Sequence, residues 1–151
     1  MQLEDQDIAW AKSAIQKTEF FALCTEDELE LLINGMGKES YRPGSTVLFQ
    51  GEISSRLLLV QTGSVSIWAR QGKDKMKLAE LGPGSYFGEI SLLTPRAATA
   101  TVKAEAETEI ISLPGEVVAA LLKKRPMLEN ALKKKIEERL ASRQKAIDNR
   151  E

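Results

Sequence analysis

Residues 87–102 read FGEISLLTPRAATATV, and this stretch decides the fold. The run is mostly apolar, yet it contains Glu89 near one end and one cation, Arg96, beside several small residues. Three glycines fall within residues 82–88, which predicts that the backbone closely approaches another group there. An ionised carboxylate in apolar surroundings needs polar partners, so Glu89 is a candidate functional residue.

Two interpretations of this stretch remain open. In the first, it forms two strands joined by a buried turn, and Arg96 extends to solvent. In the second, the residues after Gly88 form a helical turn whose amides face an anion, and Arg96 supplies a fork matched to phosphate oxygens. A ligand with a phosphate and hydroxyl groups would satisfy the amides, Glu89 and Arg96 together. The second interpretation therefore predicts a nucleotide or a sugar phosphate.

Composition excludes several classes of function. The chain has 151 residues, a net charge of −1 and no histidine, so Ser/His and Cys/His nucleophile pairs and the commonest metal ligand are missing. We therefore expect no catalytic residues and no metal site, and a metal enzyme of the cupin type is disfavoured. The single Cys24 is interpreted as a structural thiol in a reducing compartment. The near-neutral charge argues against nucleic acid as a partner.

The remaining pattern predicts one domain over residues 1–151, of class α+β. Residues 1–40 are expected to hold N-terminal helices, one over 8–15 and one that starts with a Thr25/Glu28 capping box. Short β-rich runs separated by glycine turns predict an antiparallel β-roll, a jelly-roll-like barrel, over residues 41–113. Two C-terminal helices are expected within residues 115–151, separated at a proline. The second carries an apolar stripe: Leu128, Leu132, Ile136 and Leu140.

Several segments resemble the cyclic nucleotide-binding domain family, of the kinase regulatory subunit and bacterial cyclic nucleotide-gated channel type. The segments FGEISLL, PRAAT and TVKA are similar to that family's phosphate-binding cassette, which we assign to residues 87–102. FFALCTEDELELL resembles the helix that enters the domain, and YRPGSTVLFQGEISSRLLLVQTGSVSIW resembles its first strands. The resemblance covers most of the chain.

The resemblance implies a β-roll that holds the cyclic phosphate and ribose, and a C-terminal helix that closes over the base. Glu89 would accept a hydrogen bond from the ribose 2′-hydroxyl, with amides near Gly88 and Ile90 assisting, and an arginine would neutralise the phosphate. The implied ligand is cyclic AMP or cyclic GMP, acting as a regulator and not as a catalytic cofactor. The candidate ligand-binding residues are Phe87, Gly88, Glu89, Ile90, Ser91, Arg96, Ala97, Ala98 and Thr99.

The cassette departs from the family pattern at its arginine. The family places this residue nine positions after the glutamate, which is Ala98 here, whereas Arg96 comes two positions early. We favour the ungapped register, because the strand residues after it then fit without a paired deletion and insertion. The following position, associated with nucleotide preference, is Thr99 in the ungapped register and Ala97 in the gapped one. These residues slightly favour cyclic AMP over cyclic GMP as the ligand.

We therefore predict a regulatory sensor module for a cyclic nucleotide, not an enzyme. It is expected to be the cytoplasmic ligand-binding part of a larger protein such as an ion channel, at the cytoplasmic face of a membrane but not inserted in it. Expected partners are the nucleotide and, through the flanking helices, a second copy or an effector domain. The alternative is a degenerate domain, or a variant whose arginine has been replaced at Ala98, that binds nucleotide weakly or not at all and serves in assembly.

Overall fold

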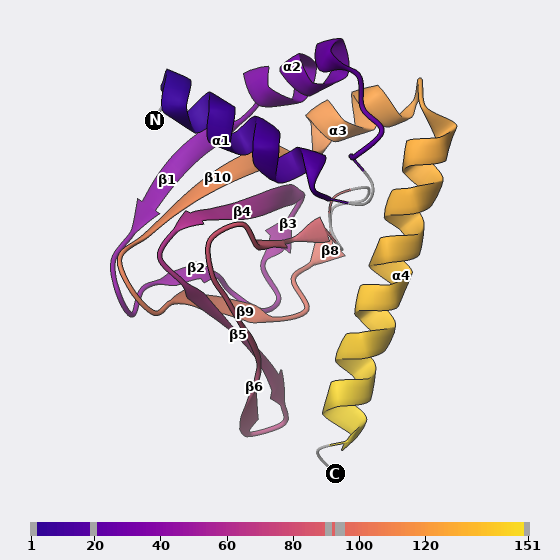
Figure 1. Ribbon diagram of the computed structural model, residues 1–151. Coiled ribbons are helices and arrows are strands. Elements are labelled where there is room, and N and C mark those ends of the chain that lie inside the picture. Colours follow the sequence, from indigo (N-terminus) through magenta and orange to yellow (C-terminus); the bar gives the residue numbers. More distant parts are fainter. Residues whose placement is uncertain (1–2, 19–20, 90–91, 93–95, 150–151) are drawn as a thin grey trace.

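The computed structural model describes residues 3–18, 21–89, 92 and 96–149. It has the α+β architecture predicted, an antiparallel β-roll flanked by helices at both ends of the chain (Figure 1). The helices are α1 (Asp5–Gln16), α2 (Glu26–Asn34), α3 (Gly115–Leu122) and α4 (Pro126–Asn149). The strands are β1 (Gly37–Tyr41), β2 (Thr46–Leu48), β3 (Ile53–Ser54), β4 (Arg56–Thr62), β5 (Val65–Gln71), β6 (Asp74–Leu81), β7 (Tyr86–Phe87), β8 (Arg96–Ala97), β9 (Thr101–Ala104) and β10 (Thr108–Pro114).

The strands form two main antiparallel sheets and one short pair. One sheet has the order β1-β10-β4-β7 and the other the order β2-β9-β5-β6, while β3 pairs with β8. Helices α1, α2 and α3 gather at one end of the roll, and α4 runs along its side (Figure 1). The β5–β6 hairpin turns at Gly72, whose φ of +64° suits glycine.

Strand β4 is buried on both faces, which explains its uninterrupted apolar sequence. Leu58 and Val60 face the interior of the roll, where they join a core built from residues of both main sheets. Leu57 and Leu59 point the other way, into a second core formed with the helices. Because successive strand residues alternate between faces, a strand covered on both sides needs apolar residues at every position.

The helices dock through the apolar positions that their sequences predict. The capping box is confirmed: Glu28 N donates to Thr25 Oγ1 at 3.2 Å, and Thr25 N donates to Glu28 Oε1 at 2.9 Å. On α4, Leu128, Leu132 and Ile136 are buried in the core between the helices and the β1-β10-β4-β7 sheet. The stripe therefore holds α4 against its own domain.

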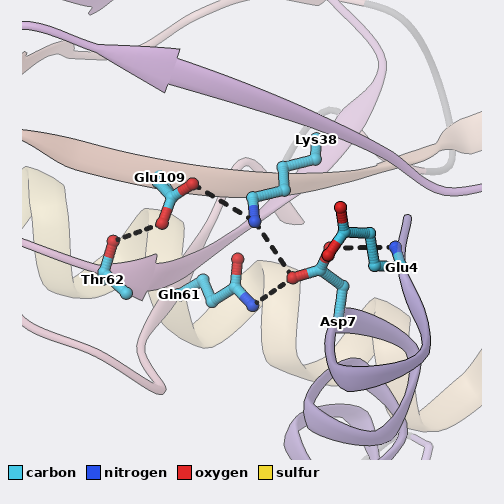
Figure 2. Close-up of polar contacts among 6 residues, drawn as sticks. All are labelled: Glu4, Asp7, Lys38, Gln61, Thr62 and Glu109. Carbon is cyan, nitrogen blue, oxygen red and sulfur yellow. Dashed lines mark hydrogen bonds and ion pairs between the residues drawn. The ribbon is translucent and has the colours of Figure 1, made fainter. Parts of the chain in front are cut away.

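Strand β1 starts at Gly37, four residues before the β region expected from the sequence. Its sequence GKESY is polar because β1 is an edge strand that pairs only with β10 in the described structure. Lys38 of β1 takes part in a polar network that ties α1 to the sheet (Figure 2). Asp7 Oδ1 accepts from Lys38 Nζ at 3.0 Å and from Gln61 Nε2 at 2.8 Å, so this buried carboxylate is well satisfied.

Candidate ligand-binding site

The start of the cassette is fixed by a close approach between two strands. Strand β7 pairs with β4 through Phe87 and Leu58, and Gly88 follows with a φ of +90°. A Cβ atom at this position would overlap the carbonyl oxygen of Arg56. Only glycine suits both the backbone conformation and the space. The tight turn delivers Glu89 into the interior, where it is 1% exposed.

The carboxylate of Glu89 is paired with a cation from the C-terminal helix. Arg139 Nε of α4 lies 3.2 Å from Glu89 Oε1. Within the described residues this oxygen has no partner with good hydrogen-bond geometry, so the contact is an ion pair more than a directed hydrogen bond. The guanidinium also lies 5.9 Å from the centre of the Tyr86 ring. The cassette and α4 are thereby joined through one buried acceptor.

Arg139, the ion-pair partner of Glu89, is not among the candidate residues that the sequence suggests. On α4, the sequence pattern singles out only the apolar stripe for contact with the rest of the domain. Position 139 lies seven residues after Leu132 and three after Ile136, which places it on the same face of the helix. That spacing was the available signal.

The structure separates Arg96 from Ala98. Arg96 and Ala97 form β8, pair with Ser54 and Ile53 of β3, and are exposed. Ala98 is 8% exposed and belongs to the core inside the roll. Its backbone is fixed by hydrogen bonds to the loop between β2 and β3. Ala98 N donates to Glu52 O at 2.8 Å, and Gly51 N donates to Ala98 O at 2.9 Å.

The other candidate residues divide into two groups. Phe87 is buried in the core of the roll, and Thr99 is half-buried. Ile90 and Ser91 fall outside the described residues. Leu92 is buried, and its amide donates to the carbonyl oxygen of Glu89 at 3.2 Å. The arrangement offers a buried carboxylate acceptor whose present partner could be exchanged for a hydroxyl donor.

The described residues include one free thiol, that of Cys24. Burial and the nearby Glu28 raise the pKa of the half-buried Cys24 thiol, which disfavours the thiolate. In the described part of the chain, no group of three or more Asp, Glu or Cys residues could hold a metal ion. None of the helices among those same residues is long and apolar enough to cross a bilayer.

Comparison with known proteins identifies the family. The profile described as "Cyclic nucleotide-binding domain" matches residues 38–125. This range covers more than half of the chain and includes both main sheets, the Glu89 turn and α3. The chain belongs to the cyclic nucleotide-binding domain family.

Individual relatives agree with this assignment. The chain is 30% identical over 123 residues to the cyclic AMP receptor protein of Thermus thermophilus, which covers 81% of the chain and 57% of that protein. It is 36% identical over 93 residues to potassium/sodium hyperpolarization-activated cyclic nucleotide-gated channel 3 of Homo sapiens, covering 62% of the chain and 12% of the channel. The regulatory domain of Toxoplasma gondii PKA, solved with cAMP, superposes with a TM-score of 0.71 at 22% identity, over 78% of this chain and 45% of that one. The chain thus spans little more than half of the first of these relatives.

Proposed function

We propose that this domain is a sensor for cyclic AMP, and that Glu89 and Arg139 couple ligand binding to helix α4. The observation that carries the proposal is the buried ion pair between these residues, with Nε and Oε1 3.2 Å apart. The pair joins the part of the roll that resembles a ribose site to the helix nearest the C-terminus.

The coupling follows from competition for one carboxylate. A ribose 2′-hydroxyl that donates to Glu89 would share or replace the contact with Arg139. Because a buried charge must stay paired, Arg139 would then move toward the ligand or toward solvent, and α4 would move with it. We place the pivot of this motion at residues 123–125, which connect α3 to α4 just before Pro126. Any signal depends on a difference in ligand affinity between the two positions of α4.

The choice of cyclic AMP and of a regulatory role rests on the family and on its named members. The Thermus thermophilus relative is a cyclic AMP receptor, and the Toxoplasma gondii domain was solved with cAMP. We propose no catalytic role. The output would pass to other parts of a larger cytoplasmic protein, or to a second copy, through the flanking helices. Cyclic GMP is the comparison ligand.

Calorimetric titration of paired variants tests the role of Glu89. We expect Glu89→Ala to weaken cyclic AMP binding by tenfold or more, since a hydrogen bond to a charged group contributes about 1.5–3 kcal/mol. The matched control is Glu107→Ala, which changes an exposed glutamate outside the candidate residues and should bind as the unchanged chain does. Equal affinities for the two variants would contradict the proposal.

A second candidate function is an assembly domain that has lost its nucleotide. The observation that favours it is the neutral, buried Ala98 at the register position of the family arginine, with Arg96 exposed on β8. In the sensor proposal, the phosphate is held by backbone amides and by Arg96. Arg96→Ala should therefore weaken cyclic AMP binding if the sensor proposal is right, and should change nothing if the domain binds no nucleotide.

A further inference from the structure

A cavity of about 690 Å³ lies on the outer face of the β2-β9-β5-β6 sheet, and Thr101 at the end of the cassette range is one of the residues that line it. Along β5 and β9, Ile67 and Val102 are buried in the core of the roll. The residues that alternate with them face outward and line the cavity. The full lining is Thr46, Phe49, Gln50, Trp68, Ala69, Arg70, Gly72, Lys75, Thr101 and Lys103. It includes none of the nine candidate cassette residues.

All the charged side chains that line this cavity are cations. Arg70, Lys75 and Lys103 come from the end of β5, from β6 and from β9, and no carboxylate is among the lining residues. Within the described residues, no ion pair is formed by any of these three cations. The chain as a whole has a net charge of −1, so this concentration of positive charge is local. Such a cluster favours a ligand with several negative charges.

Two aromatic side chains supply flat apolar surfaces beside the cations. Phe49 is 60% exposed, a large apolar surface left in water. The Trp68 indole N–H donates to Ser66 Oγ at 2.8 Å, which fixes the orientation of the ring. Base–aromatic stacking is favourable and tolerates any base.

The floor of the cavity is held by Gln50. Its Oε1 accepts from Arg70 N at 2.8 Å, and its backbone N donates to Thr101 Oγ1 at 2.9 Å. The loop that carries Phe49 and Gln50 is therefore attached to both β5 and β9. This attachment holds the loop that carries Phe49 against β5 and β9 before any ligand arrives, which lowers the entropy cost of ordering the loop on binding.

We propose that this cavity binds a nucleoside polyphosphate. The phosphates lie among Arg70, Lys75 and Lys103, and the base lies against Phe49 or Trp68. The volume falls within the range of small-molecule sites, and both ligand features have a counterpart in the lining. The absence of lining carboxylates gives no ligands for a divalent cation, so the nucleotide binds without a protein-held metal.

Trp68 reports on this site directly. The chain has two tryptophans, and Trp10→Phe leaves Trp68 as the single indole. We expect ATP, added in EDTA at low salt, to change the Trp68 emission saturably. Affinity should fall from ATP to ADP to AMP, as phosphate charges are removed. Inorganic triphosphate, which has the charge but no base, should bind more weakly than ATP and change the emission less.

Paired lysine variants distinguish ATP binding at this cavity from general attraction of anions to the protein surface. Lys103→Ala or Lys75→Ala should weaken ATP binding by about tenfold, because each removes a charge-assisted contact. The control Lys134→Ala removes an exposed lysine of α4 and should have no effect. Saturating cyclic AMP should leave the ATP response unchanged, since the two sites share no candidate residue. The ATP response should stay unchanged whether or not cyclic AMP binds the cassette.

Four results would overturn the proposal. The first is no saturable change in Trp68 emission up to about 1 mM ATP. The second is an equal loss of affinity in Lys103→Ala and Lys134→Ala, which would mean diffuse attraction. The third is full displacement of ATP by cyclic AMP, which would place ATP in the cassette. Affinity for triphosphate equal to that for ATP would also refute the stacking of the base.

Discussion

Replacing Asp7 with asparagine should destabilise the fold at neutral pH and have almost no effect near pH 2. Asp7 is 2% exposed and accepts from Gln61 Nε2, from Glu4 N and from Lys38 Nζ, at 2.8, 3.0 and 3.0 Å (Figure 2). The Gln61 and Glu4 hydrogen bonds, with Lys38, lower the pKa of Asp7 from 3.8 to about 2, against the opposing effect of burial. This difference corresponds to about 2.5 kcal/mol of folding free energy.

The sign of the pH dependence follows from the lowered pKa. The stabilisation is fully present above the unfolded value of 3.8 and is lost as the pH falls through about 2. Urea unfolding of both chains at pH 7, 5 and 3 should therefore give a difference of about 2–3 kcal/mol at pH 7 that shrinks by pH 3. The control Glu26→Gln breaks an exposed pair with Lys12 and should cost less than about 1 kcal/mol. A difference for Asp7→Asn that stays constant with pH would refute the reasoning.

Three further substitutions test the packing around the site. Gly88→Ala should lower the free energy of unfolding, measured with urea, by more than about 1 kcal/mol, because a Cβ would overlap the Arg56 carbonyl and φ is +90°. An unchanged urea midpoint would mean that the turn relaxes freely. Leu132→Ala should lower the free energy of unfolding by about 2–5 kcal/mol in the same assay, since Leu132 of α4 is fully buried against the rest of the domain. A loss below about 1 kcal/mol would show that α4 is not docked. Arg139→Gln leaves the Glu89 carboxylate buried without its cation. It should destabilise the domain by roughly 1–3 kcal/mol at pH 7, a range reduced because the Arg139 side chain is 29% exposed. Full stability would mean that the ion pair is not formed in solution.

Local sequence patterns predict much of the architecture. The continuous apolar run of β4 indicates a strand covered on both faces, and the Thr25/Glu28 pair marks the start of α2. The stripe on α4 predicts a docked helix, and the helix is docked. Each of these features depends on the period or spacing of a few residues, which a single sequence displays.

What the sequence could not provide depends on contacts between distant segments. Strand β1 lacks apolar alternation, and it is held by its pairing with β10, whose residues follow 67 to 75 positions later in the chain. Arg139 has an ordinary helix-surface sequence context, and its role appears only when α4 lies beside Glu89. The positively charged cavity is likewise assembled from separate strands, with Lys103 on β9 and Arg70 on β5.

The most direct test of the sensor proposal is calorimetric titration of cyclic AMP into the unchanged chain and into Ala98→Arg, with cyclic GMP as the comparison. We expect saturable cyclic AMP binding to the unchanged chain. We also expect binding to Ala98→Arg that is roughly ten- to hundredfold tighter, because a charge-assisted contact to the phosphate contributes about 1.5–3 kcal/mol. Circular dichroism would verify that Ala98→Arg is folded. Absence of cyclic AMP binding to the unchanged chain would contradict the account and leave the assembly domain as the function.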